Sequence, residues 1–237
     1  MSGIQTDGKP LALLIPGLDG TGRLFYRQLE ALGVRYRVCP WSYGPETDFD
    51  LHDLARKLGE ATAEEKPGSI LIVGESFGGL VALDYVLLYP ERVQRLVLEN
   101  AFPCYRRRLR ARLAHALIPL LLLGVGQRIK DFVVDRTLRQ EGILVEDRRL
   151  LQEAMRHINL GAYRRRLELI RKVDLRPHLP QITVPTVLLA SGRDKLVPSI
   201  REAHFMASQI PNARVYEFPE AGHALLLTPG ISLADYV

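Results

Sequence analysis

The chain has 237 residues and a net charge of +5; 47% of its residues are apolar and 25% are charged. This composition is typical of a globular protein and excludes a disordered or fibrous one. A chain of this length buries enough apolar surface to fold without a disulfide or a metal ion.

Apolar runs alternate with amphipathic segments along most of the sequence. In chain order, strands are predicted within residues 9–16, 36–43, 69–74, 93–98, 184–191 and 213–218, and helices within 21–32, 50–65, 77–89, 199–209 and from 224 onward. Asp48 or Asp50 suits the N-cap of the second helix. This alternation predicts a parallel α/β sheet with right-handed crossovers.

The alternation stops between residues 103 and 180, where only helices are predicted. We therefore divide the chain into a core, residues 1–102 and 181–237, and an inserted helical cap segment, residues 103–180. The cap segment carries 18 Lys and Arg against 8 Asp and Glu, a balance of +10, whereas the rest of the chain has a balance of −5. Such asymmetry indicates a different task or a different partner.

A G-x-S-x-G motif follows the third predicted strand and precedes a predicted helix, with Ser76 at its centre. Gly74 and Gly78 are expected because a serine on a sharp strand-to-helix turn leaves no space for side chains two positions away. The motif alone is weak evidence, because a pattern of five residues with only three fixed also arises by chance. The alternative is a turn of small residues that packs a helix on a sheet. The flanking strand and helix favour a nucleophile elbow.

Asp194 and His223 each come just after a predicted strand, where open parallel sheets place functional groups. Serine is a poor nucleophile until a base takes its proton, so His223 is the candidate general base for Ser76. Asp194 would orient the imidazole and stabilise its charged form. Glu99, at the end of the fourth predicted strand, is a rival for the acid.

The loop 16–22, PGLDGTG, follows the first predicted strand. Its glycines allow backbone N–H groups to approach an oxyanion, and we expect the donors to be the N–H groups of Leu18 and Phe77. Gly17 and Asp19 are assigned to substrate binding. A nucleotide site is the alternative, but the loop lacks the GK[ST] ending of a P-loop. No cofactor or metal is expected.

Together these features resemble the α/β-hydrolase superfamily over nearly the whole chain. The resemblance implies an α/β-hydrolase fold, a mostly parallel sheet flanked by helices, and a serine hydrolase with a Ser76–His223–Asp194 triad. The loop 16–22 is similar to that of a branch with bacterial esterase-like proteins and plant plastid acyltransferases that make phytyl esters. It departs from the usual His-Gly by having Pro16. The short N-terminal part predicts a reduced sheet.

The cap segment offers an apolar run and two arginine clusters, Tyr105 to Arg112 and Tyr163 to Arg166. Leu120 and Leu121 are candidates to line an acyl pocket. The arginines suit anionic substrates or peripheral contact with a lipid surface, and a solvated helix face is the alternative. No nucleic-acid motif is present.

The predicted function is hydrolysis of a small-molecule carboxylic ester or thioester. One alternative is acyl transfer through the same acyl-enzyme. Another is a ligand-binding receptor that keeps the triad but turns over slowly. No charged segment followed by an apolar one opens the chain, and the longest apolar run, 116–125, is too short to cross a bilayer. We therefore expect a cytoplasmic protein, and Cys39 and Cys104 are expected to be free thiols.

Overall fold

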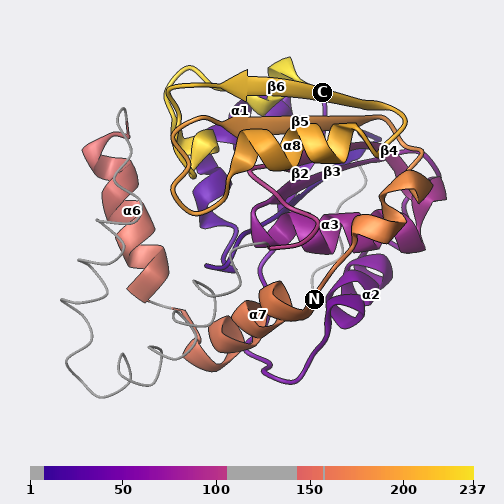
Figure 1. Ribbon diagram of the computed structural model, residues 1–237, viewed down its shortest axis with the longest axis horizontal. Helices are drawn as coiled ribbons and strands as arrows, with labels where there is room; N and C mark the ends of the chain where they lie inside the picture. The colour runs from indigo at the N-terminus through magenta and orange to yellow at the C-terminus, as the bar shows by residue number, and fades with distance from the viewer. Residues whose placement is uncertain (1–7, 106–142, 157) are drawn as a thin grey trace.

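The computed structural model describes residues 8–105, 143–156 and 158–237. Within them, six strands form one sheet in the order β2-β1-β3-β4-β5-β6, and every neighbouring pair is parallel (Figure 1). The strands are β1 Leu11–Ile15, β2 Arg37–Pro40, β3 Ile70–Glu75, β4 Val93–Glu99, β5 Thr186–Ser191 and β6 Ala213–Phe218. The predicted α/β fold with a mostly parallel sheet is confirmed.

Helices flank the sheet on both faces. The α-helices are α1 Leu29–Gly33, α2 Leu51–Ala61, α3 Phe77–Leu88, α6 Val145–Arg156, α7 Leu160–Lys172 and α8 Ser199–Ala207. Short 3-10 helices are η1 Arg23–Gln28, η2 Pro90–Arg92, η3 Arg176–Gln181, η4 Leu225–Leu227 and η5 Leu233–Asp235. Asp50 caps α2, where its carboxylate accepts from the Asp53 N–H and the Asp53 carboxylate accepts from the Asp50 N–H.

Alternate residues of each strand enter different cores, because successive side chains of a strand point to opposite faces. In β1, Leu13 packs with α2 and α3, whereas Leu14 packs with η1, α1 and the C-terminal segment. Central strands that are covered on both faces are apolar at nearly every position, which is why their sequences are continuous apolar runs.

Two predicted helices differ from the structure. Residues 21–32 form η1 followed by the short α1. The helix predicted from residue 224 onward is wrong, since only η4 and η5 form there. Pro229 and Gly230 separate these two turns, and Gly230 has a φ of 82°. A proline biases the residue before it away from helix, so the apolar run Leu225–Leu227 ends after one turn.

Both α6 and α7 belong to the cap segment and are joined to the core by polar contacts. On α6, the buried Asp147 accepts from the Tyr26 hydroxyl and from Arg27 Nε, at 2.9 Å for the latter. On α7, Arg165 Nε donates to the Phe49 carbonyl at 2.7 Å. The predicted pocket residues Leu120 and Leu121 and the arginines 106–112 lie outside the described residues.

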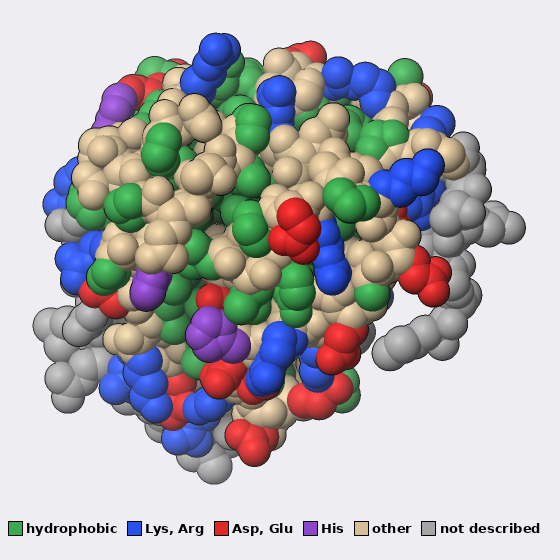
Figure 2. Space-filling view, turned by 90° about the vertical axis from the view of Figure 1, so that its right-hand side faces the viewer, with side chains coloured by type: hydrophobic (Ala, Val, Ile, Leu, Met, Phe, Trp, Pro, Cys, Tyr) green, Lys and Arg blue, Asp and Glu red, His purple; other side chains and the backbone are tan. Residues whose placement is uncertain are grey.

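The described surface carries charges of both signs. Figure 2 shows Lys and Arg side chains interspersed with Asp and Glu on one face of the molecule. No helix among the described residues has the length and apolar character needed to cross a membrane. Cys39 and Cys104 form no disulfide; Cys104 is buried and Cys39 is half-buried.

Candidate active site

Ser76 lies between the end of β3 and the first residue of α3. Its φ of 52° is in the left-handed region, which is uncommon for a residue other than glycine. A Cβ atom at Gly78 would lie 2.2 Å from the Ile15 carbonyl oxygen, and one at Gly74 would lie 2.7 Å from the Gly78 oxygen. The glycines of the motif are therefore required by close backbone packing, as the sequence predicts.

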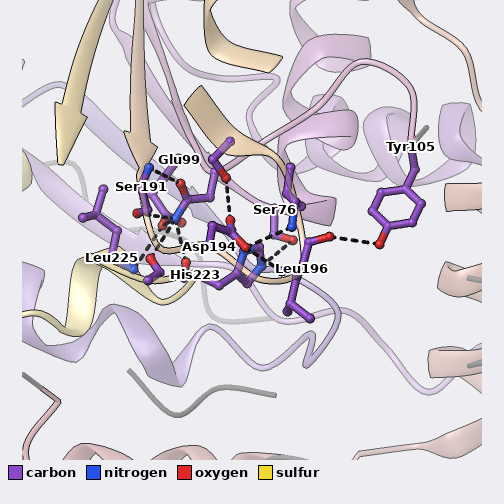
Figure 3. Close-up of polar contacts among 12 residues, drawn as sticks. Ser76, Glu99, Tyr105, Ser191, Asp194, Leu196, His223 and Leu225 are labelled. Atoms are coloured by element: carbon purple, nitrogen blue, oxygen red, sulfur yellow. Dashed lines mark hydrogen bonds and ion pairs between the residues drawn. The ribbon is translucent and has the colours of Figure 1, made fainter. Parts of the chain in front are cut away.

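The three residues predicted as a triad come together at the carboxyl ends of the strands (Figure 3). Ser76 Oγ lies 3.0 Å from His223 Nε2, and Asp194 Oδ2 lies 2.7 Å from His223 Nδ1. Asp194 follows β5 and His223 follows β6, whose loops are joined by a hydrogen bond from the Arg193 N–H to the Ala221 carbonyl. The contacts form a continuous path from the hydroxyl to the carboxylate.

The Asp194 carboxylate is held on both of its oxygens. Oδ1 accepts from the N–H groups of Leu196 and Val197 at 2.8 and 2.9 Å. Oδ2 faces His223 and also accepts from the Ser199 hydroxyl at 2.5 Å. These donors fix the orientation of the carboxylate, and Ser199 is a member of this network that the sequence analysis did not find.

The surroundings of this pair lower the pKa of Asp194 and raise the pKa of His223. Burial opposes the charge of Asp194, but His223, the Ser199 hydroxyl and the Val197 N–H favour it, so its pKa lies below the usual range. Burial likewise lowers the pKa of His223, but the charge and hydrogen bond of Asp194, with the charge of Glu75, raise it above 6.5 overall.

Glu99, the rival acid, has other partners. It is fully buried, and its Oε1 accepts from Asn100 Nδ2 at 2.7 Å and from the Leu225 N–H at 3.2 Å. Burial and the charges of Glu75 and Asp194 raise its pKa well above the usual range, so the charged form of this carboxyl is disfavoured. The geometry therefore gives Asp194, and not Glu99, the contact with the imidazole.

Asn100 holds the His223 loop against the sheet. Its Nδ2 donates to the His223 carbonyl at 2.7 Å and to Ser191 Oγ at 2.9 Å, and its Oδ1 accepts from the Ser191 N–H at 2.9 Å. No sequence motif marks this residue. Its only signal is its place directly after β4, at the edge of the sheet where the triad lies.

The loop 16–22 lies directly beside Ser76. A Cβ atom at Gly17 would be 3.5 Å from the Ser76 Cβ. Among the described residues, no hydrogen-bond acceptor is found for the N–H of Leu18 or of Phe77. Within this part of the chain, both predicted oxyanion donors are thus left without an acceptor. The Asp19 carboxylate accepts from the Thr21 N–H and hydroxyl at 2.9 and 2.6 Å, which shapes the loop itself.

Glu75 is a further buried carboxyl next to the site, and sequence reasoning did not single it out. Burial and the charge of Asp19 raise its pKa to about 7, while His223 and the Gly17 N–H act in the opposite direction. Within the described residues, no group of three or more His, Cys, Asp or Glu side chains is arranged to hold a metal ion.

Known proteins resemble this chain along nearly its whole length. The family model for the alpha/beta hydrolase fold matches residues 10–229. The protein named carbamate hydrolase RutD of Serratia proteamaculans is 29% identical over 240 residues, which cover 95% of this chain and 88% of that one. The pimeloyl-[acyl-carrier protein] methyl ester esterase of Nitrosomonas europaea is 31% identical over 242 residues, covering 95% and 93%.

Solved structures share the fold. A hydrolase from Pseudomonas aeruginosa PA01 superposes with a TM-score of 0.79 at 22% identity, covering 92% of this chain and 84% of that one. An esterase from Exiguobacterium antarcticum gives a TM-score of 0.77 at 21% identity, covering 91% and 85%. At this identity the likeness establishes the architecture alone.

Proposed function

The chain belongs to the alpha/beta hydrolase family, and we propose that it is a serine hydrolase that cleaves a small-molecule carboxylic ester or thioester. The observation that carries the proposal is the path of contacts from Ser76 Oγ through the His223 imidazole to Asp194, at 3.0 and 2.7 Å. Relatives named as esterase and carbamate hydrolase support an acyl substrate with a heteroatom leaving group.

In the proposed mechanism, Ser76 Oγ attacks the carbonyl carbon as His223 Nε2 accepts its proton. Asp194 stabilises the imidazolium, and the N–H groups of Leu18 and Phe77 donate to the tetrahedral oxyanion. His223 then protonates the leaving alcohol or thiol, which departs and leaves an acyl-Ser76. A water molecule, deprotonated by His223, releases the acid and regenerates the hydroxyl. Gly17, which lies beside Ser76, would border the substrate.

We expect a fluorophosphonate probe to label Ser76 covalently, because an activated serine beside free oxyanion donors attacks phosphorus as it attacks a carbonyl. Peptide mass spectrometry locates the adduct, and a panel of p-nitrophenyl esters, thioesters and carbamates of varied acyl length ranks the substrates. Heat-unfolded protein is the control.

Labelling at another residue, or none in protein that turns over esters, would contradict the serine mechanism. Labelling of Ser76 with a single slow acylation and no turnover of the panel would instead favour a receptor. Faster product formation when a second alcohol is added would favour acyl transfer.

The pH profile of kcat/KM should fall on the acid side with a midpoint above 6.5. Only the neutral imidazole accepts the proton of Ser76, and the pKa of His223 is raised, so activity is lost as the pH drops through that raised value. Glu75→Gln should move the midpoint to lower pH, because it removes a negative charge that favours the imidazolium.

The control for this measurement is Glu91→Gln, an exposed glutamate in η2, which directly precedes β4 and so lies at the opposite end of that strand from the site. We expect its midpoint to equal that of the parent. An acid midpoint that is the same in the parent and in Glu75→Gln would show that Glu75 does not influence the imidazole.

A further inference from the structure

Arg166 on α7 is a buried arginine that reaches the loop 16–22. Only 3% of the residue is exposed, and its Nε and one terminal nitrogen donate to the Leu18 carbonyl at 3.1 and 2.9 Å. The sequence suggests a solvated or substrate-binding arginine cluster at 163–166. The structure divides the cluster: Arg164 is exposed, Arg165 is half-buried and Arg166 is buried.

The burial of this guanidinium is unusual, because no carboxylate among the described residues lies within ion-pair distance of it. Its charge is favoured by the Leu18 carbonyl, by the Tyr43 ring, whose centroid lies 5.4 Å from Cζ, and by the more distant charge of Asp19. Burying a charged group is costly unless it is well hydrogen-bonded. The close fit also involves Gly20, where a Cβ atom would lie 3.0 Å from Arg166 Cζ.

Tyr43 holds the other end of the same loop. Its hydroxyl donates to the Pro16 carbonyl at 3.1 Å, and its ring packs edge-to-face on Phe77 with centroids 5.9 Å apart. The Pro16 carbonyl belongs to the peptide before Gly17, and the Leu18 carbonyl belongs to the peptide before Asp19. Side chains therefore anchor the peptides on both sides of the Gly17–Leu18 peptide, whose N–H is one of the proposed oxyanion donors.

We propose that Arg166 is a positioning residue: its two-fold hydrogen bond to the Leu18 carbonyl, with Tyr43 on the Pro16 carbonyl, holds the Leu18 N–H toward the oxyanion. The inference rests on the proposed function. It assigns α7 a part in the chemistry of the core, since an element of the cap segment fixes the geometry of a donor that binds charge only in the transition state. Fixed donors of this kind lower the barrier because they need no reorganisation during the reaction.

The test compares Arg166→Lys and Arg166→Met with the parent, using a neutral and an anionic p-nitrophenyl ester and an alkylboronic acid. The boronic acid adds to the serine as a tetrahedral mimic. Loss of one oxyanion donor costs roughly 10²–10³ in kcat, so we expect a misplaced donor to lower kcat by about 10–100-fold with a KM within about 3-fold of the parent. Boronic acid affinity should fall in parallel, and lysine, which keeps one donor, should lose less than methionine.

Arg165→Met is the matched control. Arg165 is the neighbouring residue on α7, and its Nε also donates to a core carbonyl, that of Phe49 at 2.7 Å, but it does not touch the loop 16–22. We expect its kcat to stay within about 2-fold of the parent. Thermal unfolding of each variant identifies loss of fold, and the Arg166→Lys variant decides the question if Arg166→Met does not fold.

Three results would overturn the inference in an active parent. Unchanged kcat and boronic acid affinity in both Arg166 variants would exclude positioning. A rise in KM confined to the anionic ester would mean that Arg166 binds the charged group of the substrate and does not position the loop. Equal losses in Arg165→Met would mean that α7 attachment in general is what matters. A parent that neither turns over esters nor is labelled at Ser76 would instead overturn the proposed function itself.

Discussion

Replacing Ser76 by alanine should lower kcat/KM for a p-nitrophenyl ester by about 10⁶-fold, the scale of loss when the nucleophile of another serine hydrolase is removed. Alanine lacks the oxygen that attacks the carbonyl, while the imidazole and the backbone donors remain. The measurement is ester hydrolysis at saturating and subsaturating substrate, corrected for spontaneous hydrolysis, with thermal unfolding to establish that the variant is folded.

Ser69→Ala is the matched control for Ser76→Ala. Ser69 directly precedes β3, at the opposite end of the strand from Ser76, and its hydroxyl donates to the Lys66 carbonyl at an exposed turn. We expect this variant to retain parental activity. More than about a hundredth of the parental kcat/KM in folded, pure Ser76→Ala would contradict a nucleophilic role for the serine.

Asp194→Asn should lower kcat by about 10⁴-fold while the protein stays folded, as at the equivalent acid of another triad enzyme. The N–H groups of Leu196 and Val197 both donate to Oδ1, so the asparagine carbonyl oxygen should occupy that position. Its amide nitrogen then faces His223 Nδ1 and donates to it. The imidazole is forced to carry its proton on Nε2, where it cannot accept the proton of Ser76.

Glu99→Gln separates the two candidate acids. Burial and the neighbouring carboxylates disfavour the charged form of Glu99, and glutamine is close to it in shape. The glutamine carbonyl oxygen can still accept from Asn100 and the Leu225 N–H. We expect a loss of less than about 10-fold, well below the roughly 10⁴-fold loss expected for the triad acid. Measured kcat in the reverse order, with both variants folded, would assign the acid to Glu99.

Local signals in the sequence were sufficient to predict the elbow and the strands. The run before Ser76 is apolar because β3 is covered on both faces, and the glycines around it follow from close backbone contacts. Asp194 and His223 could be found because each directly follows a strand. The alternation of apolar strands and amphipathic helices likewise predicted a parallel sheet.

The contacts that support the site could not be predicted in the same way, because they join residues far apart in the chain. Arg166 meets the carbonyl of Leu18 across 148 positions, and nothing in the local pattern distinguishes it from the exposed Arg164. The raised pKa of Glu75 depends on burial that only the folded chain creates. Asn100 was missed for the same reason, since all its side-chain contacts beyond Glu99 come from the C-terminal part of the chain.

The φ of 52° at Ser76 lowers the stability of the fold at the residue that is proposed to act as the nucleophile. A residue with a side chain held in a sparsely populated conformation costs about 1–3 kcal/mol, and glycine avoids that cost. Selection for the stability of the fold alone would therefore favour glycine at this turn, whereas the proposed role of Ser76 as the nucleophile requires the serine hydroxyl. A lineage that lost the reaction would be free to relax this residue first, and its descendants would keep the sheet while the nucleophile disappeared.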